Sequence, residues 1–278
     1  MSSLDTGKAV ARGTRRPPRR MLPWRASSPF RHVQAEIVRA SATATVIMCG
    51  RFTLRTPAAI LKDYFGLGDL PGLTPRYNVA PTQPVGALRT APAGLRWGEL
   101  RWGLVPNWAK DPAIGSRMIN ARAETLATKP AFREAFEQRR CAIPADGFYE
   151  WQKIDGGGKQ PYHLSRRDGE PFAFAGLWEH WRDRASGVAI ESCTVITTTP
   201  NELLAPIHDR MPVMLDCEGT IEWLREEAAP AALEVLLQPY PAELMRAVPV
   251  SSHVNRPAND DPACVEPAAP AQGPPRLF

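Results

Sequence analysis

The order of apolar and polar side chains predicts short strands mixed irregularly with short helices. Residues 50–55 alternate as in a strand with one buried face. Apolar residues then recur at helical spacing from Ile60 to Phe65, after a Thr56–Pro57 pair that is typical of a helix N-terminus. Prolines recur within residues 75–84, and this pattern indicates an extended segment.

The rest of the chain continues in the same manner. Further strand-like runs lie at residues 95–102, 140–143, 148–153, 162–164, 172–177, 192–197 and 247–250. Glycine-containing turns at 156–158 and 185–187 predict hairpins. Helical patterns lie at 131–138, 221–227 and 231–237, and a capping box at 199–202 predicts one more short helix. Because strands and helices do not alternate as βαβ units, we expect an α+β fold with a largely antiparallel sheet.

Composition changes sharply near residue 48. Residues 1–47 hold nine basic and two acidic residues, whereas the other 231 hold 25 basic and 27 acidic residues. This first part is rich in arginine and proline, so we expect a disordered basic extension that is absent from the mature protein, with Met48 as the true initiator. A transit peptide is the alternative. We expect one folded domain over residues 48–267 and a loose Ala/Pro-rich tail over 268–278.

Two classes of protein are disfavoured by the sequence. No apolar run approaches the ~18 residues that a membrane-spanning helix needs, so we expect no membrane association. The five cysteines are widely spaced and form no CxxC or Cys/His ligand pattern, which argues against structural zinc and against a disulfide framework. We therefore expect a cytoplasmic protein with reduced thiols, in which Cys141 and Cys193 act as small buried apolar residues.

Four clusters of polar residues stand out from the rest of the sequence. They are residues 48–52 (Met-Cys-Gly-Arg-Phe), 118–124 (Met-Ile-Asn-Ala-Arg-Ala-Glu), 146–151 (Asp-Gly-Phe-Tyr-Glu-Trp) and 207–212 (Ile-His-Asp-Arg-Met-Pro). Together they offer a thiol, an amide, a carboxylate and an imidazole. Such a set can perform nucleophilic and acid–base chemistry.

With residues 77–81 (Tyr-Asn-Val-Ala-Pro) and 102–106 (Trp-Gly-Leu-Val-Pro) between them, these clusters resemble the SRAP family of SOS response-associated peptidases, also described as abasic-site processing proteins. The resemblance runs from Met48 to about Pro267 with the motifs in family order. It implies a single α+β domain around a β-barrel-like sheet, flanked by short helices. It also implies action on abasic sites in single-stranded DNA. We expect a nucleoid-associated protein without cofactor or metal, and a monomer, because no segment of the sequence suggests a dimer interface.

The chemistry implied by the resemblance requires Cys49 to be the N-terminal residue. Its free α-amine would condense with the aldehyde of a ring-opened abasic site, and its thiol would then close a thiazolidine ring that links protein to DNA. An internal cysteine cannot react in this way, because its nitrogen is an amide. With residues 1–47 attached the chain departs from the family pattern, so either translation starts at Met48 or the segment is removed by cleavage, for which the family's peptidase name suggests self-processing.

The resemblance also implies roles for three further residues. Asn120 would orient the reacting cysteine, Glu150 would act as general acid and base, and His208 would donate a proton and promote reversal of the crosslink or strand cleavage. The ordinary alternatives are a turn asparagine, a solvated strand glutamate and a structural histidine. The aromatic residues on both sides of Glu150 favour a desolvated carboxylate with a raised pKa.

Six residues match family positions that contact DNA: Arg51, Asn78, Pro81, Trp108, Arg122 and Thr197. Arginine suits bidentate contact with phosphate. Trp108 would stack on an exposed base, and because Ala109 follows it instead of a second aromatic residue, we expect a one-sided wedge. The alternative for Trp108 is a core aromatic residue.

Two other functions stay open at this stage. A cysteine peptidase using Cys49 and His208 would need an oxyanion hole and a peptide groove, for which the sequence gives no separate signal. A non-covalent single-stranded nucleic-acid binding module would leave Cys49 with a structural role only. The motifs identify no replication or repair partner.

Overall fold

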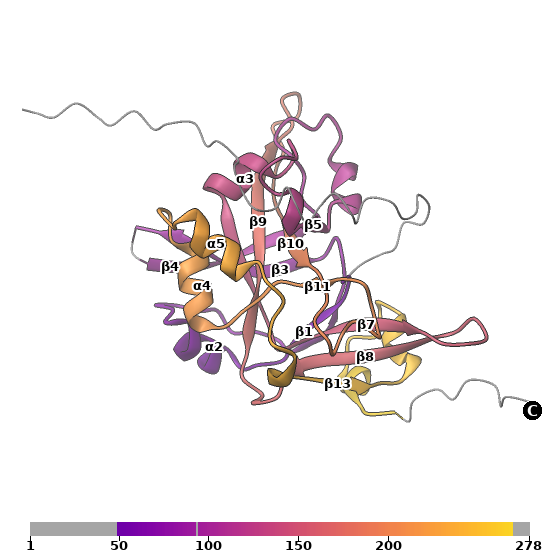
Figure 1. The fold of residues 1–278 in the computed structure, drawn as a ribbon. Coiled ribbons are helices and arrows are strands. Elements are labelled where there is room, and N and C mark those ends of the chain that lie inside the picture. The colour runs from indigo at the N-terminus through magenta and orange to yellow at the C-terminus, as the bar shows by residue number, and fades with distance from the viewer. Residues whose placement is uncertain (1–48, 93, 269–278) are drawn as a thin grey trace, which may run out of the picture. The chain divides into compact units, whose positions relative to one another are not determined.

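A closed ring of five strands forms the centre of the fold. The computed structural model describes residues 49–92 and 94–268, so the predictions for residues 1–47 and 269–278 lie outside the described residues. Around the ring lie β10 (Ala189–Thr198), β4 (Gly94–Trp102), β3 (Pro84–Ala91), β6 (Arg140–Ala145) and β9 (Phe172–Arg182), and β9 pairs back with β10 (Figure 1). The β10–β4 pair is parallel and the other four are antiparallel.

Three short strands extend this barrel. β5 (Asn120–Arg122) pairs parallel with β10, β11 (Met211–Pro212) pairs with β10, and β12 (Met214–Leu215) pairs with β9. The predicted α+β fold with a largely antiparallel, barrel-like core is confirmed.

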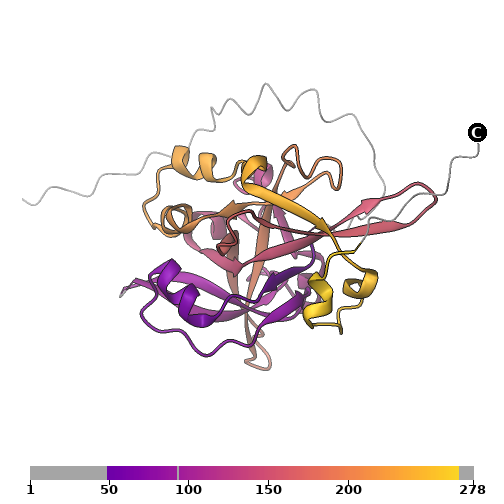
Figure 2. The same ribbon diagram turned by 90° about the horizontal axis from the view of Figure 1, so that it is seen from below.

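A second sheet packs against the barrel. In order it contains β13 (Met245–Pro249), β8 (Lys159–Arg166), β7 (Gly147–Lys153), β1 (Phe52–Leu54) and β2 (Arg76–Val79), all antiparallel. Figure 2 shows the β7–β8 hairpin extending past its neighbours. Phe52 and Phe148 of this sheet meet Trp102 and Phe174 of the barrel, with the Phe52 ring centroid 5.4 Å from that of Trp102. This aromatic layer fixes β1, and hence the residues just before it, against the barrel.

Short helices cover another side of the barrel. They are α2 (Ala58–Phe65), α3 (Arg133–Gln138), α4 (Cys217–Leu224) and α5 (Pro230–Leu236). The connections elsewhere contain the 3₁₀ turns η1 (Pro112–Arg117), η2 (Ala123–Thr125), η3 (Ala242–Leu244), η4 (Ser252–Asn255) and η5 (Pro262–Val265). Trp223 of α4 is fully buried, and its indole donates to the carbonyl of Cys141 at 2.9 Å. Cys141 and Cys193 are themselves fully buried in β6 and β10, as predicted.

Two local predictions are wrong. Residues 199–202 form no helix. The Asn201 side chain accepts from the Leu204 N–H and starts a set of turns instead. Thr56 does not cap α2, because its N–H and hydroxyl both donate to the Asp146 carboxylate and the helix begins two residues later. At Thr56 a tertiary partner replaces the local hydrogen bond that the sequence pattern offers, whereas the Asn201 amide adds a long-range donation to the Tyr240 carbonyl at 2.7 Å.

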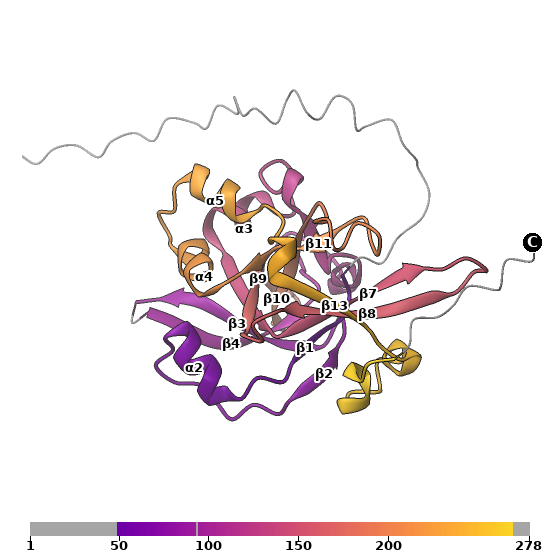
Figure 3. The same cartoon turned by 60° about the horizontal axis from the view of Figure 1, so that its bottom comes forward.

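Residues 250–268, which we call the C-terminal clamp, fold over the second sheet. Figure 3 shows η4 and η5 of the clamp beside β2 and the base of the β7–β8 hairpin. The buried Asn78 amide donates to three clamp carbonyls, those of Val254, Arg256 and Asn259, at 2.7–3.1 Å. In return, Asp260 of the clamp accepts from the main-chain N–H groups of β2. The clamp is therefore hydrogen-bonded to the same sheet that carries the site described next.

Candidate functional site

Cys49 lies immediately before β1 and against β7. Because β1 pairs antiparallel with β7, the Cys49 nitrogen donates to Glu150 Oε1 at 2.9 Å, and the Arg51 carbonyl accepts from the Tyr149 N–H. Cys49 is 5% exposed, and its φ of 33° lies in the left-handed region that few non-glycine residues adopt. Burial, and then the nearby Glu150 carboxylate, raise the pKa of the Cys49 thiol.

Glu150 is a buried carboxylate inside the sheet. It is 1% exposed, and burial raises its pKa to about 8, although the hydrogen bonds from Cys49 oppose that rise. A carboxylate with a pKa near the working pH both accepts and returns a proton readily. Its position against the Cys49 nitrogen therefore makes Glu150 the natural proton acceptor for that atom.

His208 lies on the other side of the same carboxylate. Its Nε2 is 3.9 Å from Glu150 Oε2, and its Nδ1 is 3.1 Å from Asp209 Oδ1. Burial lowers the pKa of His208, partly offset by the Asp209 charge, so the ring is neutral near pH 7. The imidazole therefore lies between a buried carboxylate and a largely exposed one, and its Nδ1 accepts from the Arg210 N–H at 3.1 Å.

The loop that carries His208 is held by an ion pair that sequence reasoning missed. Arg210 donates to both oxygens of Glu124, at 2.5 and 3.0 Å, and to the Thr197 carbonyl at 2.6 Å. Burial opposes ionisation of Glu124, but the hydrogen bonds from Arg210 outweigh it and the pKa of Glu124 is lowered. The Arg210 carbonyl in turn lies 4.0 Å from Cys49 Sγ. Both residues belong to clusters singled out in the sequence, which was the available signal.

A small cavity adjoins Cys49. Its volume is about 10 Å³, room for about one water molecule, and aromatic residues of the two sheets line it together with Val195 and Pro212. Asn120, on β5, is registered beside Val195 of β10. The structure thus brings Cys49, Glu150 and His208 into one cluster, with Asn120 on the strand next to the cavity wall.

The residues predicted to contact DNA divide into two groups. Trp108 is 59% exposed and Arg122 is exposed, so both present their side chains at the surface, and Pro81 is half-buried in the turn after β2. Arg51 instead donates to Asn78 Oδ1 and to the Val254 carbonyl, both at 3.0 Å. Asn78 and Thr197 are fully buried.

Comparisons with known proteins identify the family of this chain. The SOS response associated peptidase (SRAP) family matches residues 48–257, which is most of the chain. The chain belongs to the SRAP family. A curated relative, abasic site processing protein YoqW of Bacillus subtilis (strain 168), is 48% identical over 223 residues, covering 79% of this chain and 99% of that protein.

More distant SRAP relatives and solved structures match as well. Abasic site processing protein YedK of Escherichia coli (strain K12) is 35% identical over 190 residues, covering 65% of this chain and 81% of that protein. A crystal structure of a protein from Bacteroides thetaiotaomicron matches with a TM-score of 0.68 at 26% identity, covering 80% of this chain and 100% of that one. Among the residues that the structure describes, no helix combines the length and hydrophobicity needed to span a bilayer.

Proposed function

We propose that this protein processes abasic sites in single-stranded DNA by covalent capture through Cys49. One observation carries the proposal: the Cys49 nitrogen donates to a buried carboxylate, with an imidazole on that carboxylate's other side. The names of the SRAP relatives, which are abasic site processing proteins, support the same substrate. A thiol, a nitrogen and a proton acceptor at one point suit an aldehyde better than a peptide bond.

The proposed reaction uses both nucleophiles of one residue. The α-amine attacks the C1′ aldehyde of the ring-opened abasic sugar, and loss of water gives an imine. Cys49 Sγ then forms a bond to the same carbon, while the thiol proton ends on the nitrogen of the new thiazolidine ring. No bond in the DNA backbone breaks, and the only product released is water.

Glu150 and His208 would move the protons that these steps require. Glu150 takes a proton from the attacking amine and returns it to the departing hydroxyl, because it contacts the nitrogen directly. His208 connects Glu150 to Asp209 and thus to solvent. In the reverse direction the same relay supports release of the crosslink, and a leaving oxygen protonated by His208, after His208 has taken a proton from Glu150, would support strand cleavage.

The mechanism requires that the mature chain begins at Cys49. We propose that residues 48–267 form the functional SRAP domain, and that residues 1–47 are absent because translation starts at Met48, which is then removed, or because the Met48–Cys49 bond is cleaved. The SRAP match begins at residue 48, in support of this boundary. Intact-mass measurement of the protein from its native source tests it: a chain starting at Met1 or Ser2 would refute it.

For DNA binding we propose two distinct roles for the predicted contact residues. Trp108, Arg122 and Pro81 act from the surface, where a base can stack and a phosphate can be paired. Arg51 and Asn78 act indirectly, because their hydrogen bonds join the segment after Cys49 to the C-terminal clamp. Thr197 supports the Arg210 guanidinium through its carbonyl.

A denaturing gel tests the function. The Met48-initiated protein is incubated with single-stranded DNA bearing one abasic site, beside Cys49→Ala, Cys49→Ser and a variant with one residue inserted before Cys49. We expect a covalent band only for the parent chain, with non-covalent binding retained by all variants. Salt-sensitive binding with no covalent band would instead identify a binding module. Peptide cleavage that depends on Cys49, without crosslinking, would identify a peptidase.

A further inference from the structure

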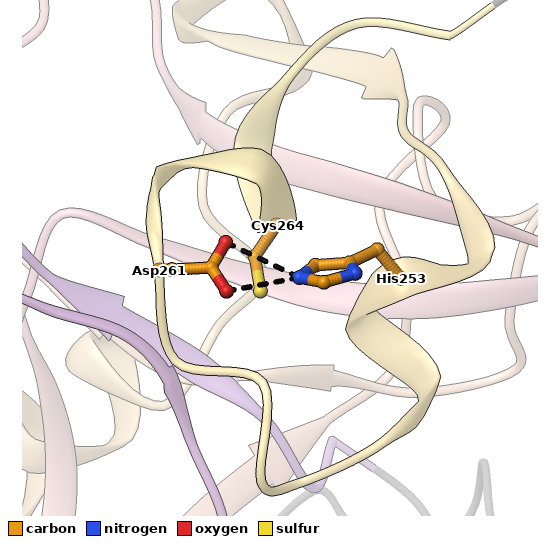
Figure 4. Close-up of side chains that lie close together, drawn as sticks. All are labelled: His253, Asp261 and Cys264. Atoms are coloured by element: carbon orange, nitrogen blue, oxygen red, sulfur yellow. Dashed lines mark hydrogen bonds and ion pairs between the residues drawn. The ribbon is translucent and has the colours of Figure 1, made fainter.

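A second cluster of chemically active side chains lies in the C-terminal clamp. Figure 4 shows His253, Asp261 and Cys264 pointing toward one another. His253 Nε2 is 3.0 and 3.2 Å from the two Asp261 oxygens, and one ligand atom from each residue lies within 4.8 Å of the other two. None of these residues has a part in the chemistry proposed for Cys49. The cluster is not apparent in the sequence, because its spacing, His-x₇-Asp-x₂-Cys, matches no common zinc motif.

We propose that His253, Asp261 and Cys264 bind one zinc ion. The donor set is an imidazole nitrogen, a carboxylate oxygen and a sulfur, the three ligand types that zinc takes in proteins. In a tetrahedral site such atoms lie about 3.3–3.8 Å apart, given metal–ligand distances of about 2.0–2.3 Å. Only a small contraction of the cluster would therefore be needed. His253 and Asp261 are partly exposed, with 37% and 49% of their side chains accessible, so an ion can enter and a water molecule can complete the shell.

The clamp holds the three residues in place without a metal. Ser251 caps η4 by accepting from the His253 N–H, and Asp261 caps η5 by accepting from the Ala263 N–H. The Cys264 N–H donates to the Asp261 carbonyl at 3.0 Å, and Cys264 is fully buried. The backbone of each ligand is thus fixed by hydrogen bonds independent of the proposed ion, which reduces the entropy lost on binding.

Coordination would change the protons of the cluster. The Cys264 thiol now donates to the Asn259 carbonyl at 3.2 Å, and it would lose that proton to solvent as the sulfur–zinc bond forms. Coordination through His253 Nε2 places the ring proton on Nδ1, so the Asn259 amide nitrogen, 3.2 Å from Nδ1, would have to move away. The thiolate and the Asp261 carboxylate together neutralise Zn²⁺. Arg51, which acts electrostatically on Cys264, favours the thiolate but weakens the attraction for the cation.

A zinc ion in the clamp would restrain residues that pack beside the candidate active site. Cys264 and Val254 pack in one buried cluster with Tyr149, the residue before Glu150. On the other side of Glu150, the Trp151 indole donates to the clamp residue Asn255 at 2.8 Å. A zinc ion that joins η4 to η5 would therefore restrain both neighbours of the buried carboxylate. The proposal does not depend on the proposed function of Cys49.

Metal titration of the full chain tests the proposal. Protein stripped with EDTA is titrated with Co²⁺ as a spectroscopic substitute and then with Zn²⁺, and its melting temperature is recorded. We expect one equivalent of Co²⁺ to give a thiolate-to-metal absorption band, one equivalent of Zn²⁺ to abolish it, and Zn²⁺ to raise the melting temperature. Absence of stoichiometric binding overturns the proposal.

Matched variants assign the ligands. Cys264→Ser and His253→Ala should lose the absorption band and the thermal shift. Loss of an outer-shell partner lowers metal affinity roughly 10–100-fold, and loss of a direct ligand should lower the affinity for zinc at least as much. Asp261→Asn keeps an oxygen for the η5 cap, so it tests coordination even if removal of the buried Cys264 thiol unfolds the clamp. Cys49→Ala and Cys217→Ser, which change thiols elsewhere, should keep both signals. A band that survives in Cys264→Ser and disappears in Cys49→Ala would overturn the assignment.

Discussion

At the residue scale, the state of the Cys49 nitrogen decides the charge of Glu150. When that nitrogen is a peptide amide, burial keeps the carboxyl neutral up to its raised pKa of about 8. When it is a terminal amine, it carries a positive charge next to the carboxylate, and an opposite charge at this distance lowers a carboxyl pKa. If the mature chain begins at Cys49, as proposed, the pKa of Glu150 would therefore be lower and Glu150 would act as a base.

The raised pKa of Glu150 predicts a pH dependence of stability. In a chain whose Cys49 nitrogen is an amide, folded Glu150 binds a proton up to about pH 8, whereas in the unfolded chain it releases that proton near its ordinary value. The folded state thus holds more protons between about pH 5 and 8, so this group's contribution to stability falls as pH rises through that range. Chemical denaturation at several pH values should show the fall in the parent and a smaller one in Glu150→Gln. Equal slopes would contradict the raised pKa.

Weakening the ion pair between Arg210 and Glu124 should impair crosslink formation more than DNA binding. Arg210→Lys loses the two-pronged contact with Glu124 and the bond to the Thr197 carbonyl, so the loop that places His208 and faces Cys49 Sγ loses its anchor. We expect crosslink formation to slow about tenfold or more, with DNA affinity changed less than about threefold. Single-turnover gels and a binding titration measure the two. Arg166→Lys, which alters an ion pair with Asp168 outside the site, is the control and should leave both values unchanged.

At the element scale, the clamp depends on one buried amide. Asn78→Ala removes the donors for three clamp carbonyls and the acceptor for Arg51. Each buried polar group left without a partner costs about 1–3 kcal/mol, so we expect a loss of at least about 2 kcal/mol in the free energy of unfolding. Denaturant melts measure this loss. Asn78→Asp retains an oxygen for Arg51 but cannot donate, so it should also destabilise the clamp. A near-neutral Asn78→Asp would show that the three donations contribute little.

How far the elements could be predicted depended on what each segment packs against. Strands with a clear apolar run, such as β7 and β9, were found, although both extend beyond the predicted limits. β3 was missed because it carries a proline and a glycine and, as a barrel strand, buries consecutive residues instead of alternate ones. β5 was missed because three residues, including Asn120, are too few to show a period. Its pairing with β10 is a tertiary effect.

The site was predicted more fully than its surroundings. The motifs named Cys49, Glu150 and His208, and these three meet. The inward turn of Arg51 and the burial of Asn78 could not be foreseen, because both depend on the clamp, whose hydrogen bonds cross more than 170 positions of sequence. For the same reason the meeting of His253 with Cys264 was not expected.

At the scale of the whole molecule, the closed barrel leaves no room at Gly176. A Cβ there would lie 2.6 Å from Ile143 Cδ1 and 2.9 Å from the main-chain oxygen of Thr194. Gly176→Ala should therefore destabilise the protein by about 1–3 kcal/mol, as overpacking of a filled core does. Thermal melts test this, with Gly68→Ala as the control because nothing lies within 4 Å of its Cβ position and its φ is not positive. A neutral Gly176→Ala would mean that the barrel adjusts freely.

The exposure of Trp108 predicts that DNA binding can be weakened without a change in stability. Trp108 is exposed, and the loop that carries it is held by the Trp181 indole, which donates to the Ala109 carbonyl at 2.7 Å. Trp108→Ala should leave the melting temperature unchanged and weaken binding to single-stranded DNA by about 1–3 kcal/mol, the value of one stacked base. Fluorescence anisotropy measures the affinity. Val235→Ala, another exposed apolar residue, should alter neither property. Unchanged affinity in Trp108→Ala would exclude the proposed stacking.

The hydrogen bond between Cys49 and Glu150 spans 101 positions of the chain, and the Arg210 carbonyl that faces the Cys49 thiol is 161 positions away. During synthesis Cys49 therefore leaves the ribosome long before Glu150 and Arg210, and the clamp comes later still. A truncated or half-made product carries Cys49 but no pocket around it. The proposed capture of abasic sites would in this way be limited to chains in which the clamp has already been translated.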